Sequence, residues 1–310
     1  MGLRKIKAYT KLLRIDSWQV WLFNFALGSI LFALPQIDRF VLVLFSFSLA
    51  TSGIFILNQY FDRKDDKNNN LKKDLPIASG DVPPTVGLIL CYSFIVASLV
   101  IVFFAGISLF LLFIGYLFLG IGYSTPPFCF KNRPVLDVIV CGVGSGVLPF
   151  LIGLQTSSQL TLNFTLPWMV RRYQDALLIA IPIFLVQSAG QLFQVAGDYQ
   201  ADSIAKINTF AVKYGKTTTL RLANVFLLVT ISLPIIYGVL NLSLTPYLSW
   251  YLIVFVFLAP CLLYLIYSLR DSSVERFRTL RNLSRRIGGV LLLILFFYVL
   301  VARIILNGAH

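Results

Sequence analysis

Amide and carboxylate side chains recur at every fourth position where a long apolar run ends. Asn58, Asp62 and Asp66 follow this spacing at the end of the run Phe40–Phe61 and just beyond it. On a continuous helix, residues four positions apart lie on one face, so these three side chains point the same way. An acidic side chain beside a bilayer is costly unless a partner binds it. We therefore interpret the three residues as one half of a binding site.

The same spacing returns later in the chain. Asp198 and Asp202 lie four residues apart in the stretch DYQAD, and Gln187, Gln191 and Gln194 precede them. A polar stripe on an otherwise apolar helix is expected to face a cavity inside the protein rather than lipid. The two acids are therefore candidates for the second half of the site, and Gln194 is a candidate substrate contact.

Carboxylates that converge without histidine or cysteine form a hard oxygen-ligand site. The only histidine is His310, and the four cysteines show no CxxC spacing. Such a site favours Mg²⁺, which usually shares its coordination shell with substrate phosphates. Basic side chains between the acids would clamp a diphosphate; they are Arg63, Lys67, Lys72, Lys73 and Lys206. The pattern predicts a Mg²⁺–diphosphate site.

The acids also have a simpler interpretation, in which they neutralise neighbouring lysines in solvated loops. For one charged loop alone, that interpretation would be the better one. Two acidic motifs with matching spacing, each at the end of an apolar run, favour the metal–diphosphate site instead.

The elements that carry these motifs are predicted to span a membrane. The chain has 310 residues, 58% of them hydrophobic, and a mean hydropathy of +0.83, which excludes an ordinary soluble domain. We predict an all-α integral membrane bundle that forms a single domain over residues 1–310, with a central cavity open to the cytoplasmic side and cap loops at about 62–84 and 198–217. Its runs of about 20 residues predict nine helices, at Ser17–Ile37, Phe40–Phe61, Thr85–Ile107, Leu109–Tyr123, Leu136–Leu154, Ala176–Gly197, Thr219–Asn241, Pro246–Leu269 and Ile287–Asn307.

The distribution of positive charge predicts the orientation. With a cytoplasmic N-terminus, all but four of the 26 basic residues fall on the cytoplasmic side, the four being Arg39, Arg171, Arg172 and Arg303. Nine spans then place the C-terminus on the opposite side. The net charge of +13 is spread over several loops, so we expect membrane lipids as partners and no nucleic acid.

Three stretches together are similar to a known family. NxxxDxxxD followed by LPIASG, the run DYQADSIAKINTFAVKYG and the segment YSTPPFCFKNRPVLD resemble motifs of the UbiA-type superfamily of intramembrane prenyltransferases. The last segment is similar to its chlorophyll-synthase and carotenoid-elongase branches. The resemblance extends from LLRIDSW, near Arg14, to Gly215, and it implies nine helices with both acidic loops on the cytoplasmic side.

The resemblance also implies roles for single residues. One Mg²⁺ ion would be held by Asn58, Asp62 and Asp66, and a second by Asp198 and Asp202, with a prenyl diphosphate bridging the two. Lys131, Arg14 and Lys73 would contact the diphosphate. Tyr123 would lie beside the allylic carbon, where its ring face stabilises a developing carbocation.

The chain departs from the family pattern at three positions. Gln59 stands where the family often has Asp, Leu75 stands where Arg commonly precedes the Pro, and Lys206 stands where Gly is usual. The departure at Leu75 removes a phosphate contact that Lys72 or Lys73 would replace. That at Lys206 adds a cation beside the second acidic pair.

The predicted function is Mg²⁺-dependent transfer of an isoprenyl group from a prenyl diphosphate to a hydrophobic acceptor at the cytoplasmic membrane face. Lipid-like acceptors are favoured, with an aromatic quinone precursor next. One alternative is a membrane terpene cyclase that ionises the same substrate and quenches the cation internally. Another is a secondary transporter, which the location of the acids at helix ends disfavours.

Two further polar or small-residue features have structural explanations. Gly142, Gly144 and Gly146 fall within a predicted span, so we interpret them as residues for close helix packing rather than as a phosphate loop. Asn24 lies in the first predicted span, where facing the cavity and bonding to another helix are equally good interpretations.

Overall fold

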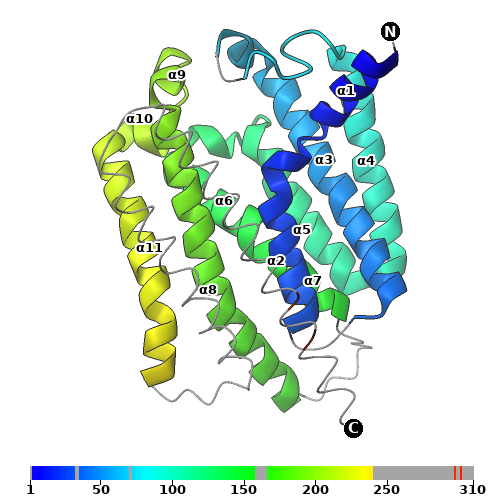
Figure 1. Ribbon diagram of the computed structural model, residues 1–310, viewed down its shortest axis with the longest axis vertical. Helices are drawn as coiled ribbons and strands as arrows, with labels where there is room; N and C mark the ends of the chain where they lie inside the picture. Colours follow the sequence, from blue (N-terminus) through cyan, green and yellow to red (C-terminus); the bar gives the residue numbers. More distant parts are fainter. Residues whose placement is uncertain are drawn as a thin grey trace.

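The computed structural model describes residues 2–31, 35–69, 72–157 and 166–239, together with residues 297 and 301. Within these ranges all regular structure is helical (Figure 1), which agrees with the predicted all-α class. The α-helices are α1 (Gly2–Leu12), α2 (Ile15–Leu31), α3 (Ile37–Asn68), α4 (Pro84–Ala105), α5 (Ile107–Ser124), α6 (Leu136–Cys141), α7 (Leu148–Ser157), α8 (Leu166–Gly197), α9 (Tyr199–Ile204), α10 (Phe210–Tyr214) and α11 (Lys216–Val239).

Five stretches in this part of the chain are long and apolar enough to cross a membrane, and they correspond to the second to sixth predicted spans. They are Ile37–Asn68, Pro84–Ala105, Ile107–Ser124, Leu136–Ser157 and Ala176–Gly197. The first and seventh predicted spans fall on α2 and α11. The eighth and ninth lie outside the described residues, apart from 297 and 301, so the count of nine stays a prediction. The predicted break between the third and fourth spans occurs at Gly106, whose φ of 133° ends α4.

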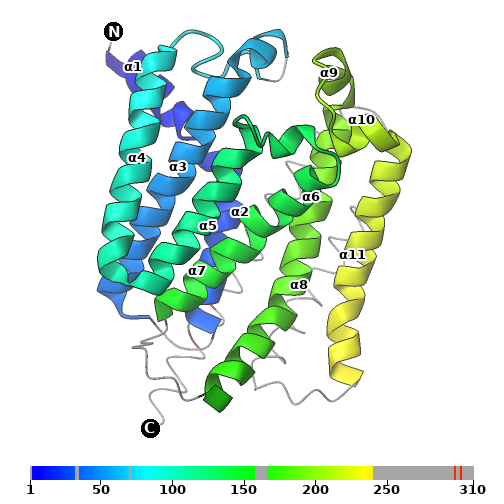
Figure 2. The same cartoon turned by 180° about the vertical axis from the view of Figure 1, so that it is seen from behind.

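One end of the bundle collects the segments that carry the acidic motifs. Figures 1 and 2 show α1, the connection from α3 to α4, and the pair α9–α10 at the same end. This grouping agrees with the prediction that the N-terminus and both acidic loops share a side. Which side of a membrane it is remains a prediction.

Glycine allows two helix pairs to approach closely. A Cβ atom on Gly28 of α2 would lie 2.0 Å from the carbonyl oxygen of Phe150, and one on Gly153 of α7 would lie 1.9 Å from that of Phe25. Earlier in the same predicted span, a Cβ on Gly142 would lie 2.2 Å from Ser188 Oγ of α8. The packing interpretation of the CGVGSG stretch is thus confirmed at Gly142, which contacts α8.

The fifth predicted span is helical but not a uniform α-helix. Between α6 and α7, residues Gly142–Val147 form a π-helical turn, a local widening that is found mostly as single turns within α-helices. The side-chain nitrogen Nδ2 of Asn24 donates to the carbonyl oxygen of Ser145 inside this turn, at 3.1 Å. Asn24 therefore forms the interhelical hydrogen bond, one of its two expected roles.

Candidate active site

Helix α3 carries the whole first motif. It extends beyond the predicted end at Phe61 to Asn68, so a single helix places Asn58, Asp62 and Asp66 along one face. The Nδ2 atom of Asn58 donates to Ser124 Oγ at the end of α5, at 2.7 Å. Asp66 is buried, whereas its neighbour Asp65 is exposed. The four-residue spacing thus distinguishes Asp62 and Asp66, which face the site, from Asp65, which faces outward.

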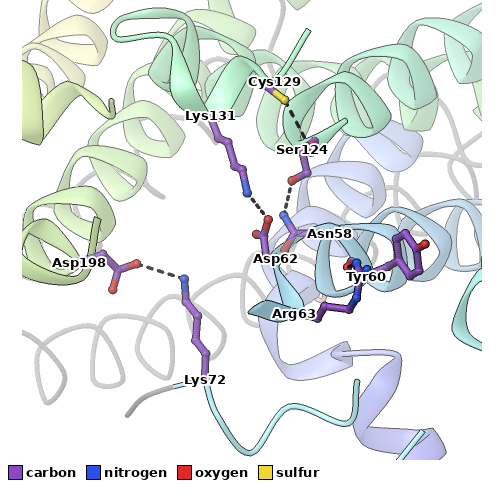
Figure 3. A network of polar contacts seen from close by, with 9 residues as sticks. All are labelled: Asn58, Tyr60, Asp62, Arg63, Lys72, Ser124, Cys129, Lys131 and Asp198. Carbon is purple, nitrogen blue, oxygen red and sulfur yellow. Dashed lines mark hydrogen bonds and ion pairs between the residues drawn. The ribbon is translucent and has the colours of Figure 1, made fainter. Parts of the chain in front are cut away.

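A lysine from the loop after α5 reaches the first motif. Lys131 lies in the short 3₁₀ turn Phe130–Asn132, and its ammonium forms an ion pair with Asp62 (Figure 3). The side chains of the pair are only 17% and 15% exposed. Charges removed from water in this way hold each other strongly, because solvent screens them little.

The second motif begins where α8 ends. Asp198 follows Gly197, and the N–H of Asp202 donates to the carbonyl oxygen of Asp198 at 2.9 Å, which keeps the two acids one helical turn apart. Burial, reinforced by the charge of Asp198, raises the pKa of Asp202 to about 6. The Thr209 hydroxyl donates to Asp202 Oδ2 at 3.4 Å.

Lys72 stands between the two motifs. Its Nζ atom lies 3.5 Å from Asp198 Oδ2, and Figure 3 shows it reaching from the loop after α3 into the space between Asp198 and Asp62. Burial lowers the pKa of Lys72, but the surrounding carboxylates outweigh burial and leave its pKa above the usual value. The carboxylates that act on it are those of Asp198, Asp66, Asp202 and Asp62. The two motifs therefore form one electrostatic unit.

The donor atoms of this site suit Mg²⁺. All the predicted ligands offer amide or carboxylate oxygen, as a hard cation prefers. Among the residues that the structure describes, no three acidic, histidine or cysteine side chains converge closely enough to enclose an ion. Lys131 and Lys72 are paired with the acids instead. A magnesium ion would therefore complete its shell with water and phosphate oxygens, which is its usual behaviour.

Tyr123 joins α5 to α8 beside the acids. Its hydroxyl accepts a hydrogen bond from Gln191 Nε2 at 2.8 Å, so the predicted glutamine stripe does face the protein interior at Gln191. Gln194, one turn further along α8, is exposed. Among the other predicted substrate contacts, Lys73 is exposed. The guanidinium of Arg14 lies 5.4 Å from the centroid of the Phe55 ring. Its positive charge also acts on the carboxylate of Asp66.

Two of the departures from the family pattern have local explanations. Gln59 is buried, and its Nε2 donates to the carbonyl oxygen of Leu12 at 2.9 Å, which ties α3 to α1 rather than to the acids. Lys206 has φ of 56°, in the left-handed region that glycine adopts at low cost. There it ends α9 in a Schellman motif, with hydrogen bonds from Lys206 N to Ser203 O and from Ile207 N to Asp202 O.

Two polar residues that hydrogen-bond to parts of the site or to segments next to it were not singled out from the sequence. Ser124 accepts the Asn58 hydrogen bond, and its position directly after Tyr123 was the available signal. Asp137 is fully buried at the start of α6. Its signal was an acid inside an apolar run.

Comparison with known proteins gives the family. The sequence profile of the UbiA prenyltransferase family matches residues 21–285. A probable homogentisate phytyltransferase 2 from rice (Oryza sativa subsp. japonica) is 30% identical over 161 residues, which cover 51% of this chain and 40% of that protein. A decaprenyl-phosphate phosphoribosyltransferase from Mycolicibacterium smegmatis is 30% identical over 156 residues, covering 50% of this chain and 42% of that protein. The chain therefore spans less than half the length of these curated relatives in each alignment.

The solved structures agree in fold. A UbiA homologue from Archaeoglobus fulgidus, bound to DMAPP and Mg²⁺, superposes with a TM-score of 0.67 at 21% identity, over 92% of this chain and 98% of that one. The family profile covers most of the chain, including α3, α8 and the two motifs that they carry. This chain belongs to the UbiA prenyltransferase family.

Proposed function

We propose that this protein transfers an isoprenyl group from a prenyl diphosphate to a hydrophobic acceptor and releases diphosphate, with Mg²⁺ as cofactor. The observation that carries the proposal is the position of Lys72, whose charge interacts with acids of both motifs. Lys72 thereby links two separate acidic helix ends, which supports a single centre in which a diphosphate is held between metal ions.

In this proposal each motif contributes the ligands of one metal. Asn58, Asp62 and Asp66 would hold one Mg²⁺ ion, and Asp198 and Asp202 a second. Bound there, Mg²⁺ would supply charge that neutralises the departing diphosphate. Lys131, already close to Asp62, donates hydrogen bonds to the same leaving group as negative charge develops on it. Asn58 is held by Ser124 for its ligand role.

The carbocation side of the reaction falls to Tyr123 and the apolar interior. The hydrogen bond from Gln191 fixes the Tyr123 hydroxyl, which leaves the ring face as the surface for an allylic cation. Helices around it exclude water that would otherwise capture the cation. Arg14, Lys73, Lys206 and Gln194 remain proposed contacts at the mouth of the site, on the cytoplasmic face. A lipid-like acceptor is proposed ahead of an aromatic one.

The relatives support the donor class more than the acceptor. The archaeal homologue is bound to DMAPP and Mg²⁺, and the rice relative is named a phytyltransferase. The mycobacterial relative is named for phosphoribosyl transfer to decaprenyl phosphate. Because its name indicates a different donor, phosphoribosyl diphosphate belongs in any donor screen.

The test is a donor–acceptor screen on purified full-length protein in lipid nanodiscs. Prenyl diphosphates of several chain lengths and phosphoribosyl diphosphate are each combined with isoprenoid alcohols, glycerolipids and aromatic acids, and products are identified by mass spectrometry. Prenylated acceptor is expected only with Mg²⁺. A cyclic hydrocarbon or alcohol formed without acceptor would identify a cyclase. Solute transport with no turnover of any diphosphate would identify a transporter and overturn the proposal.

A further inference from the structure

Asp137 is a fully buried carboxylate for which the proposed chemistry has no role. It is 0% exposed. Its Oδ1 accepts the backbone N–H of Val138 at 2.8 Å, and its Oδ2 accepts that of Phe210 at 3.0 Å. A buried carboxylate is costly unless it is paired or hydrogen-bonded, so these donors reduce the cost of its burial.

The bond to Phe210 connects two segments that are distant in sequence. Phe210 is the first residue of α10, and the preceding Thr209 provides no side-chain cap. The first N–H groups of a helix have no hydrogen-bond partner within that helix. Asp137, from another element, supplies the acceptor for the N–H of Phe210. Beside it, the N–H of Asn208 donates to Asn132 Oδ1. We call these two hydrogen bonds, Asp137–Phe210 and Asn132–Asn208, the interloop clamp.

Each side of the interloop clamp carries a residue of the site. Asn132 directly follows Lys131, which pairs with Asp62 of the first motif. On the other side, Thr209 donates to Asp202 of the second motif. The clamp therefore joins the segment that contacts the first motif to the segment that contains the second.

Apolar packing supports the same connection. Val138, which follows Asp137, and Phe210 belong to one buried cluster with Leu192 of α8. The hydrogen bonds give this packing a defined register, because a backbone N–H aimed at a carboxylate oxygen tolerates little displacement.

We propose that Asp137 is a positioning residue that holds the segment 198–209 against the Lys131 turn, so that both acidic motifs face one metal–diphosphate substrate. This inference rests on the proposed function for its kinetic consequence, but the clamp itself is testable without catalysis. In this proposal Asp137 acts through Phe210, Thr209 and Asp202 rather than by contact with substrate.

The first experiment tests the clamp by hydrogen–deuterium exchange on the full chain in nanodiscs. Asp137→Ala removes both acceptors, and Asp137→Asn keeps one oxygen while placing an N–H₂ donor against a backbone donor. Peptides covering 205–212 are expected to exchange fastest in the alanine variant and at an intermediate rate in the asparagine variant. Asp38→Asn, an exposed acid in the first turn of α3, is the matched control. Unchanged exchange in both Asp137 variants would overturn the inference.

The second experiment measures the effect of the interloop clamp on Mg²⁺ and prenyl diphosphate binding during turnover. The half-saturating Mg²⁺ concentration and the KM for prenyl diphosphate are expected to rise about 10- to 100-fold in Asp137→Ala, the range seen when residues that orient metal ligands are removed. Asn132→Leu should raise the half-saturating Mg²⁺ concentration and the KM for prenyl diphosphate. Asn132→Asp, which retains an acceptor oxygen, should keep both values near those of the wild type. Faster exchange with unaltered Mg²⁺ requirement and KM would show that Asp137 is only structural.

The two proposals fail in different ways. If the wild-type protein turns over no prenyl diphosphate, the proposed function is wrong. Asp137 is then judged by calorimetric titration of Mg²⁺ and inorganic diphosphate into the wild type and the variants. A weaker Mg²⁺-dependent diphosphate affinity in Asp137→Ala supports its positioning role, and equal affinities overturn it. If Asp137→Ala does not fold, Asp137→Asn and the Asn132 pair decide the question.

Discussion

At the scale of single residues, one acid of each motif has a cationic partner. Lys131 pairs with Asp62 and Lys72 with Asp198. Removing one member of a poorly solvated pair leaves the other charge without compensation. Each lysine therefore stabilises the acid with which it pairs, and in the proposed function it would also stabilise bound diphosphate. A substitution at either lysine should affect both interactions.

The first prediction concerns Lys131. Lys131→Met keeps much of the side-chain volume but removes the charge, so kcat is expected to fall on the order of 100- to 1000-fold, as when one donor to a developing anion is lost. Steady-state kinetics with saturating Mg²⁺ measures this. Lys64→Met, at an exposed position on α3, should leave kcat unchanged. Near-normal turnover by Lys131→Met would remove Lys131 from the proposed mechanism.

The second prediction concerns backbone strain at Lys206. A residue with a side chain in the left-handed region costs about 1–2 kcal/mol, and Lys206 has φ of 56°. Lys206→Gly should therefore stabilise the protein by about 1 kcal/mol, after allowing for the greater entropy of glycine in the unfolded chain. Thermal unfolding in detergent provides the measurement. Lys206→Ala, which keeps the Cβ atom, should show no such gain.

At the scale of elements, α3 determines which acids face the site. Because it is helical through Asn68, the side-chain directions of its polar end follow directly from the four-residue spacing. The periodicity of α3 cannot predict the direction of the Lys72 side chain, because Lys72 lies on the connection beyond the end of the helix.

A matched pair of acids on α3 tests this element. Asp62→Asn removes a proposed metal ligand and should abolish measurable turnover, whereas Asp65→Asn, at an exposed position, should leave turnover within about twofold of wild type, as surface substitutions usually do. Both variants should keep the helical circular-dichroism spectrum of the wild type. Asp62→Asn, which leaves Lys131 without its ion-pair partner, should melt at a lower temperature, whereas Asp65→Asn should melt like the wild type. Activity in Asp62→Asn after purification with Mg²⁺ would contradict the ligand assignment.

The contact between α2 and α7 gives a further prediction. A Cβ on Gly153 would overlap the Phe25 carbonyl oxygen, with 1.9 Å between them, so Gly153→Ala should destabilise the protein by about 1–3 kcal/mol or more. Gly115→Ala on α5 is the control, since nothing lies within 4 Å of a Cβ there. It should be neutral or slightly stabilising. Equal melting temperatures for the two variants would refute the close approach.

The sequence predicted the elements of the site better than the connections between them. Helix class, the break at Gly106 and the shared face of Asn58, Asp62 and Asp66 all follow from local periodicity and backbone preference. The choice of Lys72 rather than Lys73 as partner of Asp198 does not. It depends on the fold of a loop, where Lys11 donates to the Asp74 carbonyl oxygen from another helix.

The π-helical turn and the interloop clamp were equally inaccessible from the sequence. Gly142–Val147 lies within a predicted span, and no feature of the sequence marks the place where the helix widens. The widening accompanies contacts with α2 and α8, including the Asn24 hydrogen bond. Asp137 was visible as a lone acid, but its partner Phe210 is 73 positions away. Such pairings are made by tertiary structure, which local patterns do not encode.

At the scale of the whole molecule, the helical bundle and the site are separable. The buried clusters that hold α2 to α5 together consist of apolar side chains, and they need no metal. Chelation with EDTA should therefore abolish turnover while leaving the circular-dichroism spectrum and melting temperature of the protein nearly unchanged. Readdition of Mg²⁺ should restore activity. Loss of helix content on chelation would show that the metal is structural.

The position of Lys72 has a consequence for the coupling between metal binding and diphosphate binding. Lys72 and Lys131 pair with acids of the proposed site, so a divalent cation bound to those carboxylates would compete with the two ammonium groups and free them for a polyphosphate. Metal and diphosphate would then be heterotropic partners, each increasing the affinity for the other by the same factor. The protein would therefore bind metal more weakly when substrate is scarce.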